Sequence, residues 1–207
     1  MERVRSKIIA GLAALALASG GMAAAATAGN AATSDCTSCI NLAVQQFPGD
    51  VAAVSGGTAK VGQKVILSAA GPFSAEDFTP AFQGTVQDFY SAGIIGPAVG
   101  LTWPNNNVYE FQYTPANTQT GLCLAASTTA ANGVAVELEP CGVNALTTWI
   151  PLTIDQIGGF EPMINGTDTN VNTPFVLSAG SGVGDKLTTH KLDLIAGTFN
   201  PAEMWQF

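Results

Sequence analysis

Basic side chains are scarce in this chain. Its 207 residues include seven Lys or Arg against fifteen Asp or Glu, which gives a formal net charge of −8 at pH 7. Nucleic acids and anionic membrane surfaces both attract proteins through basic patches. The composition therefore argues against nucleic acid, and against a membrane surface, as the partner of this protein.

Long apolar stretches are missing too. The longest run, Ile8 to Ala18, has eleven residues, well short of the roughly 20 that span a bilayer. Basic residues precede it and small residues follow, with cleavage options between residues 26 and 32, as in a secretory signal peptide. We expect residues 1–28 to be removed and the protein to be secreted and extracellular, with no membrane attachment. Without their three basic residues and one acidic residue, the net charge is about −10.

Recognisable catalytic patterns are absent. His190 is the single histidine, and the chain has neither a Gly-x-Ser-x-Gly motif nor a catalytic-cysteine signature. The glycine-rich stretch 180–186 lacks the Gly-Lys-Ser/Thr ending of a phosphate-binding loop. Paired acids such as Glu137 and Glu139 are usually solvated on a strand face. We expect a protein that is not an enzyme and needs no cofactor.

Short β-type runs dominate, separated by Gly, Pro and Asn, while no long window has helical periodicity. These features predict an all-β fold. One exception is Cys39 to Phe47, which predicts a short N-terminal helix ended by Pro48. The stretch Gly71 to Asn107 is rich in Gly and Pro and predicts an insertion with short elements of its own. The expected strands are Lys64–Ser68, Val108–Tyr113, Gly121–Ala125, Ala135–Leu138, Thr148–Ile154, Phe175–Ala179 and Lys191–Ile195.

Four cysteines in an exported chain are usually paired, because the compartment is oxidising. Cys123 and Cys141 flank a tight Asn-Gly turn, which predicts a disulfide between adjacent strands. Cys36 and Cys39 form a Cys-x-x-Cys pair, for which a local disulfide is the favoured interpretation. A redox pair wants a βαβ context and a zinc site wants two further ligands, and the chain offers neither, so we expect no metal. Crossed pairing between the two sets stays open.

A short strand-like sequence segment recurs three times, and each copy is followed by a closing segment that contains aromatic residues. Such a repeat limits the architecture strongly. The opening phrases contain Leu67, Leu124 and Leu177, and the closing phrases are Tyr109–Phe111, Trp149–Pro151 and Trp205–Phe207.

The middle repeat, from Gly121 to Trp149, closely resembles one repeat of the ricin-type (Gln-x-Trp) β-trefoil lectin family, and the other two repeats resemble it in a degenerate form. That family's repeat opens with Gly-x-Cys-Leu-Asp, turns through Asn-Gly, reaches a second Cys and ends in Gln-x-Trp. The resemblance implies a β-trefoil over residues 60–207 with a long insertion in its first repeat. Residues 29–59 would be an N-terminal segment, of which the part near Val51 to Val61 completes the third repeat. An immunoglobulin-like sandwich is the alternative fold.

In this family an aspartate after Cys-Leu, an aromatic ring and an amide near the Gln-x-Trp phrase bind sugar. The chain departs from that pattern, because none of its repeats keeps the aspartate, whose charge-assisted hydrogen bonds strengthen such sites. The aspartate positions read Ser68, Ala125 and Ser178, and the glutamine positions read Asn107, Thr147 and Glu203.

The first repeat therefore offers the candidate sugar site. There Trp103 would stack on a sugar ring, Asn106 or Asn107 would bind its hydroxyls, and Asp77, beside Glu76, would replace the missing carboxylate. The alternative interpretation is a polar turn next to a partly buried tryptophan.

The resemblance implies a secreted, non-catalytic module that binds an extracellular glycan. The alternative is a protein-interaction or protease-inhibitor trefoil, with a protein as partner, that acts through the long first-repeat loop. A third hypothesis is a small extracellular hydrolase.

Overall fold

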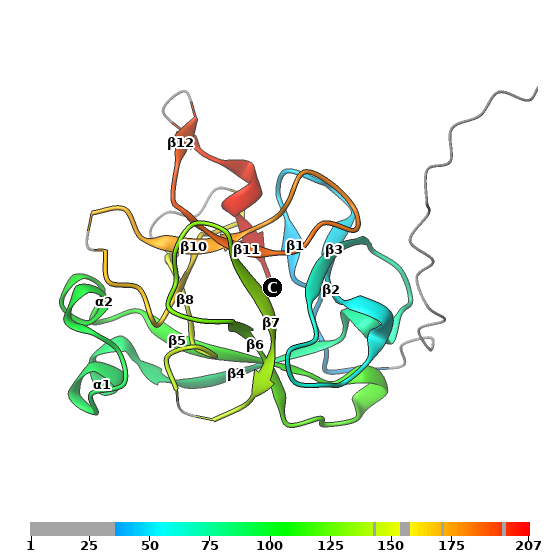
Figure 1. The fold of residues 1–207 in the computed structure, drawn as a ribbon, viewed down its shortest axis with the longest axis horizontal. Helices are drawn as coiled ribbons and strands as arrows, with labels where there is room; N and C mark the ends of the chain where they lie inside the picture. Colours follow the sequence, from blue (N-terminus) through cyan, green and yellow to red (C-terminus); the bar gives the residue numbers. More distant parts are fainter. Residues whose placement is uncertain (1–35, 143, 154–157, 171, 196–197) are drawn as a thin grey trace, which may run out of the picture.

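A computed structural model describes residues 36–142, 144–153, 158–170, 172–195 and 198–207; the expected signal peptide lies outside them. The fold is mainly β, with two short α-helices, α1 (Val86–Ser91) and α2 (Pro97–Thr102) (Figure 1). No helix in the described ranges has the length and apolar character needed to cross a membrane. Short 3-10 helices are η1 (Ser55–Gly57), η2 (Ser74–Glu76), η3 (Pro115–Asn117) and η5 (Pro201–Glu203). The strands are β1 (Ala43–Val44), β2 (Asp50–Val54), β3 (Val65–Ala69), β4 (Phe78–Thr85), β5 (Asn107–Tyr113), β6 (Leu122–Ala126), β7 (Val134–Pro140), β8 (Trp149–Pro151), β9 (Met163–Asn165), β10 (Phe175–Ser178), β11 (Thr188–Lys191), β12 (Leu194–Ile195), β13 (Thr198–Phe199) and β14 (Trp205–Gln206).

Three repeats of four strands build the fold: β1 to β4, β5 to β8, and β9, β10, β11 and β14. The fourth strand of each repeat pairs with the first strand of the next, as β4 with β5, β8 with β9, and β14 with β1. These pairings close the outer strands into a ring and leave few free edges. The expected β-trefoil is therefore confirmed.

The middle strands of each repeat form a hairpin, and the three hairpins hold one another at their tips. Each tip carries a glycine with a positive φ, between 75° and 92°, which a residue with a side chain rarely adopts. The amide of each glycine donates to a carbonyl on the neighbouring hairpin: Gly62 to Leu138 (2.8 Å), Gly133 to Thr189 (2.9 Å) and Gly184 to Leu67 (2.8 Å). The hairpins are thus linked in a closed cycle.

Phe78, Trp149 and Trp205 occupy the same position in the three repeats, at the start of the fourth strand, and all are fully buried. The indole N–H of Trp149 donates to the Leu124 carbonyl and that of Trp205 to the Leu177 carbonyl, each at 2.9 Å. The closing aromatic of the first repeat is therefore Phe78. The sequence prediction of Tyr109 for that role was wrong, because Tyr109 begins the second repeat and pairs with Trp149.

The leucine pattern also needs a correction. Leu124 and Leu177 lie on second strands, whereas Leu67 lies on a third strand, opposite Ala52. Both strands of a hairpin turn alternate residues toward the core, so an apolar phrase fits either strand. The family's aspartate position in the first repeat is consequently Ala53, not Ser68.

The N-terminal helix expected at Cys39 to Phe47 is not formed. Leu42 and Val44 point into the core at 0% and 1% exposure, with the two-residue spacing of a strand. The backbone of β1 pairs with β2 and with β14. Strand pairing with these segments therefore overrides the local helix propensity. The trefoil thus begins well before the boundary expected at residue 60, since β1 and β2 belong to its first repeat.

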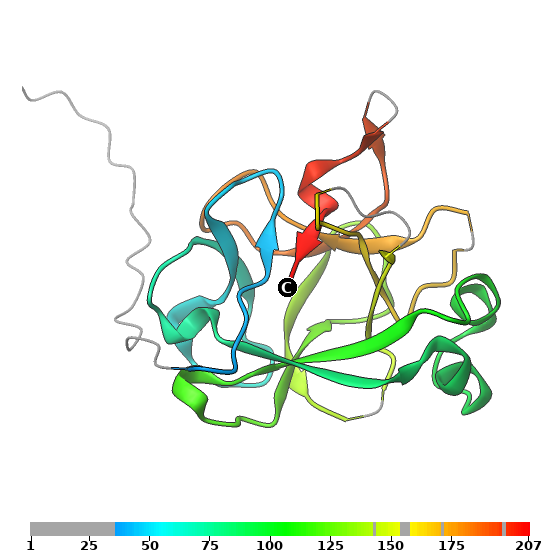
Figure 2. The same ribbon diagram turned by 180° about the vertical axis from the view of Figure 1, so that it is seen from behind.

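The stretch Gly71 to Asn107 is not one insertion, because it contains β4. Only the part with α1 and α2 is an excursion, and it lies between the first and second repeats, at the end of the long β4–β5 ribbon (Figure 2). Thr85 begins α1 through a capping box with Asp88. Apolar side chains of both helices, among them Phe89 and Val99, pack with Ile150 and Val176 in a second buried cluster.

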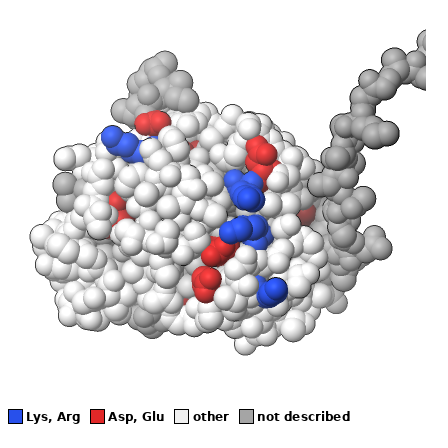
Figure 3. Space-filling view, in the orientation of Figure 1, with Lys and Arg blue, Asp and Glu red and all other residues white. Residues whose placement is uncertain are grey.

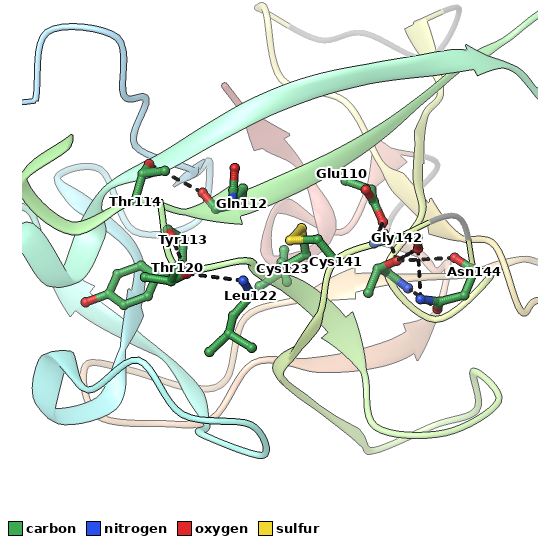
Figure 4. Close-up of a disulfide and its surroundings, with 12 residues drawn as sticks. Glu110, Gln112, Tyr113, Thr114, Thr120, Leu122, Cys123, Cys141, Gly142 and Asn144 are labelled. Atoms are coloured by element: carbon green, nitrogen blue, oxygen red, sulfur yellow. Dashed lines mark hydrogen bonds between the residues drawn. A yellow bond between two sulfur atoms is a disulfide. The ribbon is translucent and has the colours of Figure 1, made fainter. Parts of the chain in front are cut away.

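The two predicted disulfides are confirmed. Cys123–Cys141 joins β6 to the residue after β7, with 5.0 Å between the Cα atoms (Figure 4). Cys36–Cys39 closes a local loop beside the start of β1. The two bridges close loops of very different length, so we expect them to contribute differently to the free energy of unfolding.

Removing Cys123–Cys141, by Cys123→Ala with Cys141→Ala, is expected to lower the free energy of unfolding by about 3 kcal/mol, from the loss of an 18-residue loop constraint. The matched double variant of Cys36 and Cys39 is expected to cost only about 1.5 kcal/mol, because its loop is so short. Urea titrations of both variants measure these losses. Equal losses would contradict the loop-length argument.

Trp205→Phe removes the indole donor and leaves the Leu177 carbonyl buried without that bond, while Phe78 shows that a phenyl ring fits the position. We expect a loss of roughly 1–3 kcal/mol in the free energy of unfolding. Leu101→Ala is the control: this side chain is 67% exposed on α2, and its loss should change stability by less than about 0.5 kcal/mol. Denaturant titration measures both values, and an unchanged Trp205→Phe midpoint would refute the role assigned to this hydrogen bond.

Candidate functional site

Three of the predicted site residues lie together where α2 meets β5. Trp103 ends α2, its amide donating to the Val99 carbonyl at 3.0 Å, and its half-buried ring packs on the second apolar cluster. Asn106 uses its side-chain amide to donate to the Pro151 carbonyl at 2.8 Å. Asn107 is exposed at the start of β5. The side chains of Trp103 and Asn106 thus both contact other parts of the protein.

Asp77 does not join them. It lies just before β4, is 4% exposed, and accepts a hydrogen bond from the Ala116 amide at 2.9 Å. The full length of β4 separates it from Asn107, which pairs with Thr85 at the other end; at ~3.3 Å per residue this is roughly 23 Å. The idea that Asp77 supplies a carboxylate beside Trp103 is therefore wrong, because an extended strand runs between them.

The family's glutamine position, two residues before the core aromatic, is occupied by Glu76, Thr147 and Glu203. All three are buried, at 1%, 0% and 0% exposure. The sequence prediction placed Asn107 here for the first repeat, because Phe78 had not been identified as its core aromatic. Glu76 has the same spacing to Phe78 as Glu203 has to Trp205, and this spacing is the signal that was missed.

The buried carboxylates of the first and second repeats, Glu76 and Glu110, have different hydrogen-bond partners. Glu76 accepts a hydrogen bond from the Gly71 amide at 3.0 Å, while its Oε1 has no partner among the described residues. Burial raises the pKa of Glu76, and the bond from Gly71 opposes that shift. In the second repeat Glu110 accepts from the Thr147 hydroxyl at 2.5 Å and from the Gly142 amide at 3.1 Å, close to the disulfide (Figure 4).

The third repeat gathers polar groups around Glu203. Its Oε1 lies 2.9 Å from His190 Nδ1 and accepts from the Asn200 amide group at 3.3 Å, while Oε2 accepts from the Asp193 amide at 2.9 Å. Burial raises the pKa of Glu203, and the hydrogen bonds from Asp193 and His190 oppose the shift.

A surface depression of about 470 Å³ lies next to this group. The described residues of its lining are Gln45, Gln46, Thr198, Phe199 and Pro201, and they supply one aromatic ring, two side-chain amides and one hydroxyl but no charged group.

The two walls of this depression come from opposite ends of the chain. Backbone bonds hold them together, from the Gln45 amide to the Met204 carbonyl at 3.0 Å and from the Gln46 amide to the Pro201 carbonyl at 3.1 Å. Within the described ranges, the side-chain amides of Gln45 and Gln46 have no hydrogen-bond partner. No sequence pattern indicates this site, because its walls meet only through the pairing of β1 with β14.

The sequence matches no protein-family model and no curated protein. Solved structures do match. A designed 3-fold symmetric protein, ThreeFoil, superposes with a TM-score of 0.57 at 11% identity over 80% of this chain and 94% of its own. An exo-beta-1,3-galactanase from Clostridium thermocellum gives 0.56 at 10% identity over 84% of this chain, and a mosquitocidal holotoxin gives 0.54 at 10% identity over 80%.

The matched region is only 30% of the galactanase chain and 16% of the holotoxin chain. Identities this low show a shared fold and carry no residue correspondence for a site. Together with the closed ring of strands and the three linked hairpins, they establish that this chain has the β-trefoil fold.

Proposed function

We propose that the protein is a secreted, non-catalytic module that binds neutral carbohydrate in the depression lined by Phe199, Gln45 and Gln46. The observation that carries this proposal is the composition of the lining, an aromatic ring beside two unpaired amides with no charge. The two disulfides support an oxidising, extracellular location.

Sugar recognition combines two kinds of contact that this lining offers. The C–H face of a pyranose is apolar and packs on an aromatic ring, here the half-buried Phe199. A side-chain amide both donates and accepts hydrogen bonds, so Gln45 and Gln46 match sugar hydroxyls, which do the same. Because these amides have no protein partner to give up, binding a sugar costs no internal hydrogen bond.

Charge favours a neutral sugar over an anionic one. The described part of the chain contains four lysines, no arginine and the single histidine His190, and none of them is among the described residues that line the depression. In Figure 3 the lysines on the visible face lie among acidic side chains, while the surface around α1 and α2 carries no charged side chain in view. An acidic glycan would meet net negative protein charge and gain no ion pair.

Phe199→Ala is expected to lower affinity for the bound glycan by at least about tenfold, since ring stacking and its buried area contribute roughly 1.5 kcal/mol or more. A glycan array identifies the ligand, and calorimetry compares the variants. Gln45→Ala and Gln46→Ala should each weaken binding less, by the value of one hydrogen bond.

Phe82→Ala is the matched control, because Phe82 is 60% exposed on β4 and outside the depression. Trp103→Ala and Asn106→Ala test the site expected from the sequence. Binding that is lost in those two variants and kept in Phe199→Ala would overturn the location proposed here.

A second candidate function is protein interaction through the α1–α2 excursion. Residues 78–109 contain one charged residue, Asp88, yet Phe82 and Leu101 are 60% and 67% exposed there. Exposed apolar side chains on a weakly charged surface are typical of protein interfaces. A protease panel tests this candidate: inhibition that Leu101→Asp abolishes and Phe199→Ala leaves unchanged would favour it over sugar binding.

A further inference from the structure

We propose that the third repeat contains a site for a divalent transition-metal ion such as Zn²⁺, with His190 Nδ1, Asp193 Oδ2 and Glu203 Oε1 as its ligands. This site is separate from the depression at Phe199 and does not rest on the carbohydrate proposal. It uses the one histidine of the chain together with two carboxylates.

The three donor atoms already lie at separations close to those of a metal site. His190 Nδ1 is 2.9 Å from Glu203 Oε1 and 3.9 Å from Asp193 Oδ2, and all three atoms lie within 4.8 Å of one another. Tetrahedral zinc with bonds of about 2.0–2.2 Å holds its ligand atoms roughly 3.3–3.5 Å apart. Small side-chain movements therefore suffice to place all three around one ion.

The third repeat is built differently from the others at this point. Its third and fourth strands are joined by residues 192–204, while the corresponding connections are the shorter stretches 70–77 and 141–148. The additional residues form the β12–β13 hairpin, which brings the Asn200 amide within 3.0 Å of the Asp193 carbonyl. Among the described residues, only this repeat brings two carboxylates next to an imidazole at the end of the third strand.

The first repeat shows how this cluster differs from a buried carboxylate that has no imidazole next to it. Glu76 occupies the position equivalent to Glu203, but the residue equivalent to His190 is Ser68, by the register of the hairpins. In the first repeat the carboxylate thus has no imidazole beside it. Within the part of the chain that the structure describes, the combination of one imidazole and two carboxylates is found in the third repeat.

Hydrogen bonding orients the buried ligand Glu203, while the other two ligands, His190 and Asp193, are partly exposed to solvent. Glu203 is fully buried, with Oε2 bound to the Asp193 amide, so that Oε1 is directed to the imidazole. Metal-ligating carboxylates are commonly oriented by such outer hydrogen bonds. The side chains of His190 and Asp193 are 39% and 53% exposed, which gives an ion access and leaves a position for water.

The donor types decide the class of ion. One imidazole nitrogen with two carboxylate oxygens suits Zn²⁺ or a similar transition ion, whereas Ca²⁺ and Mg²⁺ prefer oxygen ligands throughout. On binding, the ion displaces the proton that lies between His190 Nδ1 and Glu203 Oε1, which moves to Nε2 or is released to water, and the neutral imidazole binds the ion through Nδ1. Two carboxylates then balance the charge of the ion.

Calorimetric titration of the whole chain with ZnCl₂ tests the proposal. We expect one Zn²⁺ per chain and no heat from MgCl₂ at the same concentration. His190→Gln should weaken Zn²⁺ binding by at least about tenfold, and Asp193→Asn should weaken it as well. Since His190 and Asp193 are both at the surface, these variants test the site even where Glu203→Gln fails to fold.

Glu76→Gln is the matched control, because it removes a buried carboxylate at the equivalent position and should leave Zn²⁺ affinity unchanged. Phe199→Ala should also leave it unchanged, which keeps this test independent of sugar binding. Absence of Zn²⁺ binding, or binding that His190→Gln does not alter, would overturn the proposal.

Discussion

The pairing of β14 with β1 is the contact on which the rest of the structure depends. It places Trp205 opposite Val44 and joins the last strand of the third repeat to the first strand of the first repeat. Without it the barrel is an open sheet with two exposed edges, which are costly to leave unpaired. The same pairing brings Gln45 next to the segment around Pro201 and so creates the depression proposed to bind sugar.

Near-symmetry and departures from it have different roles in this molecule. Positions that face the barrel interior repeat closely, as Phe78, Trp149 and Trp205 do, because each must fill the same volume. Positions outside the barrel differ in every repeat: an excursion of two helices follows the first, a disulfide lies in the second, and an additional hairpin lies in the third. The framework therefore preserves shape, while each repeat carries a different surface.

The sequence predicted the fold class and both disulfides, because spacing of cysteines and alternation of apolar residues are local signals. It misassigned the first repeat, since the apolar phrase around Leu67 fits a third strand as well as a second. It also missed the depression, whose walls come from opposite ends of the chain, and the group around Glu203, whose members lie close in sequence but meet only where the β12–β13 hairpin turns the chain back. Sequence spacing alone does not show that Asp193 and Glu203 approach His190, so the sequence indicates no role for this histidine.

The three linked hairpins form a cap over the ring of outer strands, and their glycine tips determine how this cap opens. Each tip is held by a carbonyl on the third strand of the neighbouring repeat, and the third strand of its own repeat holds another tip, so no hairpin can lift away without breaking bonds on both sides. The cap therefore opens as one cooperative unit rather than hairpin by hairpin. A side chain at Gly133 would therefore disturb a bond on which the neighbouring hairpins also depend.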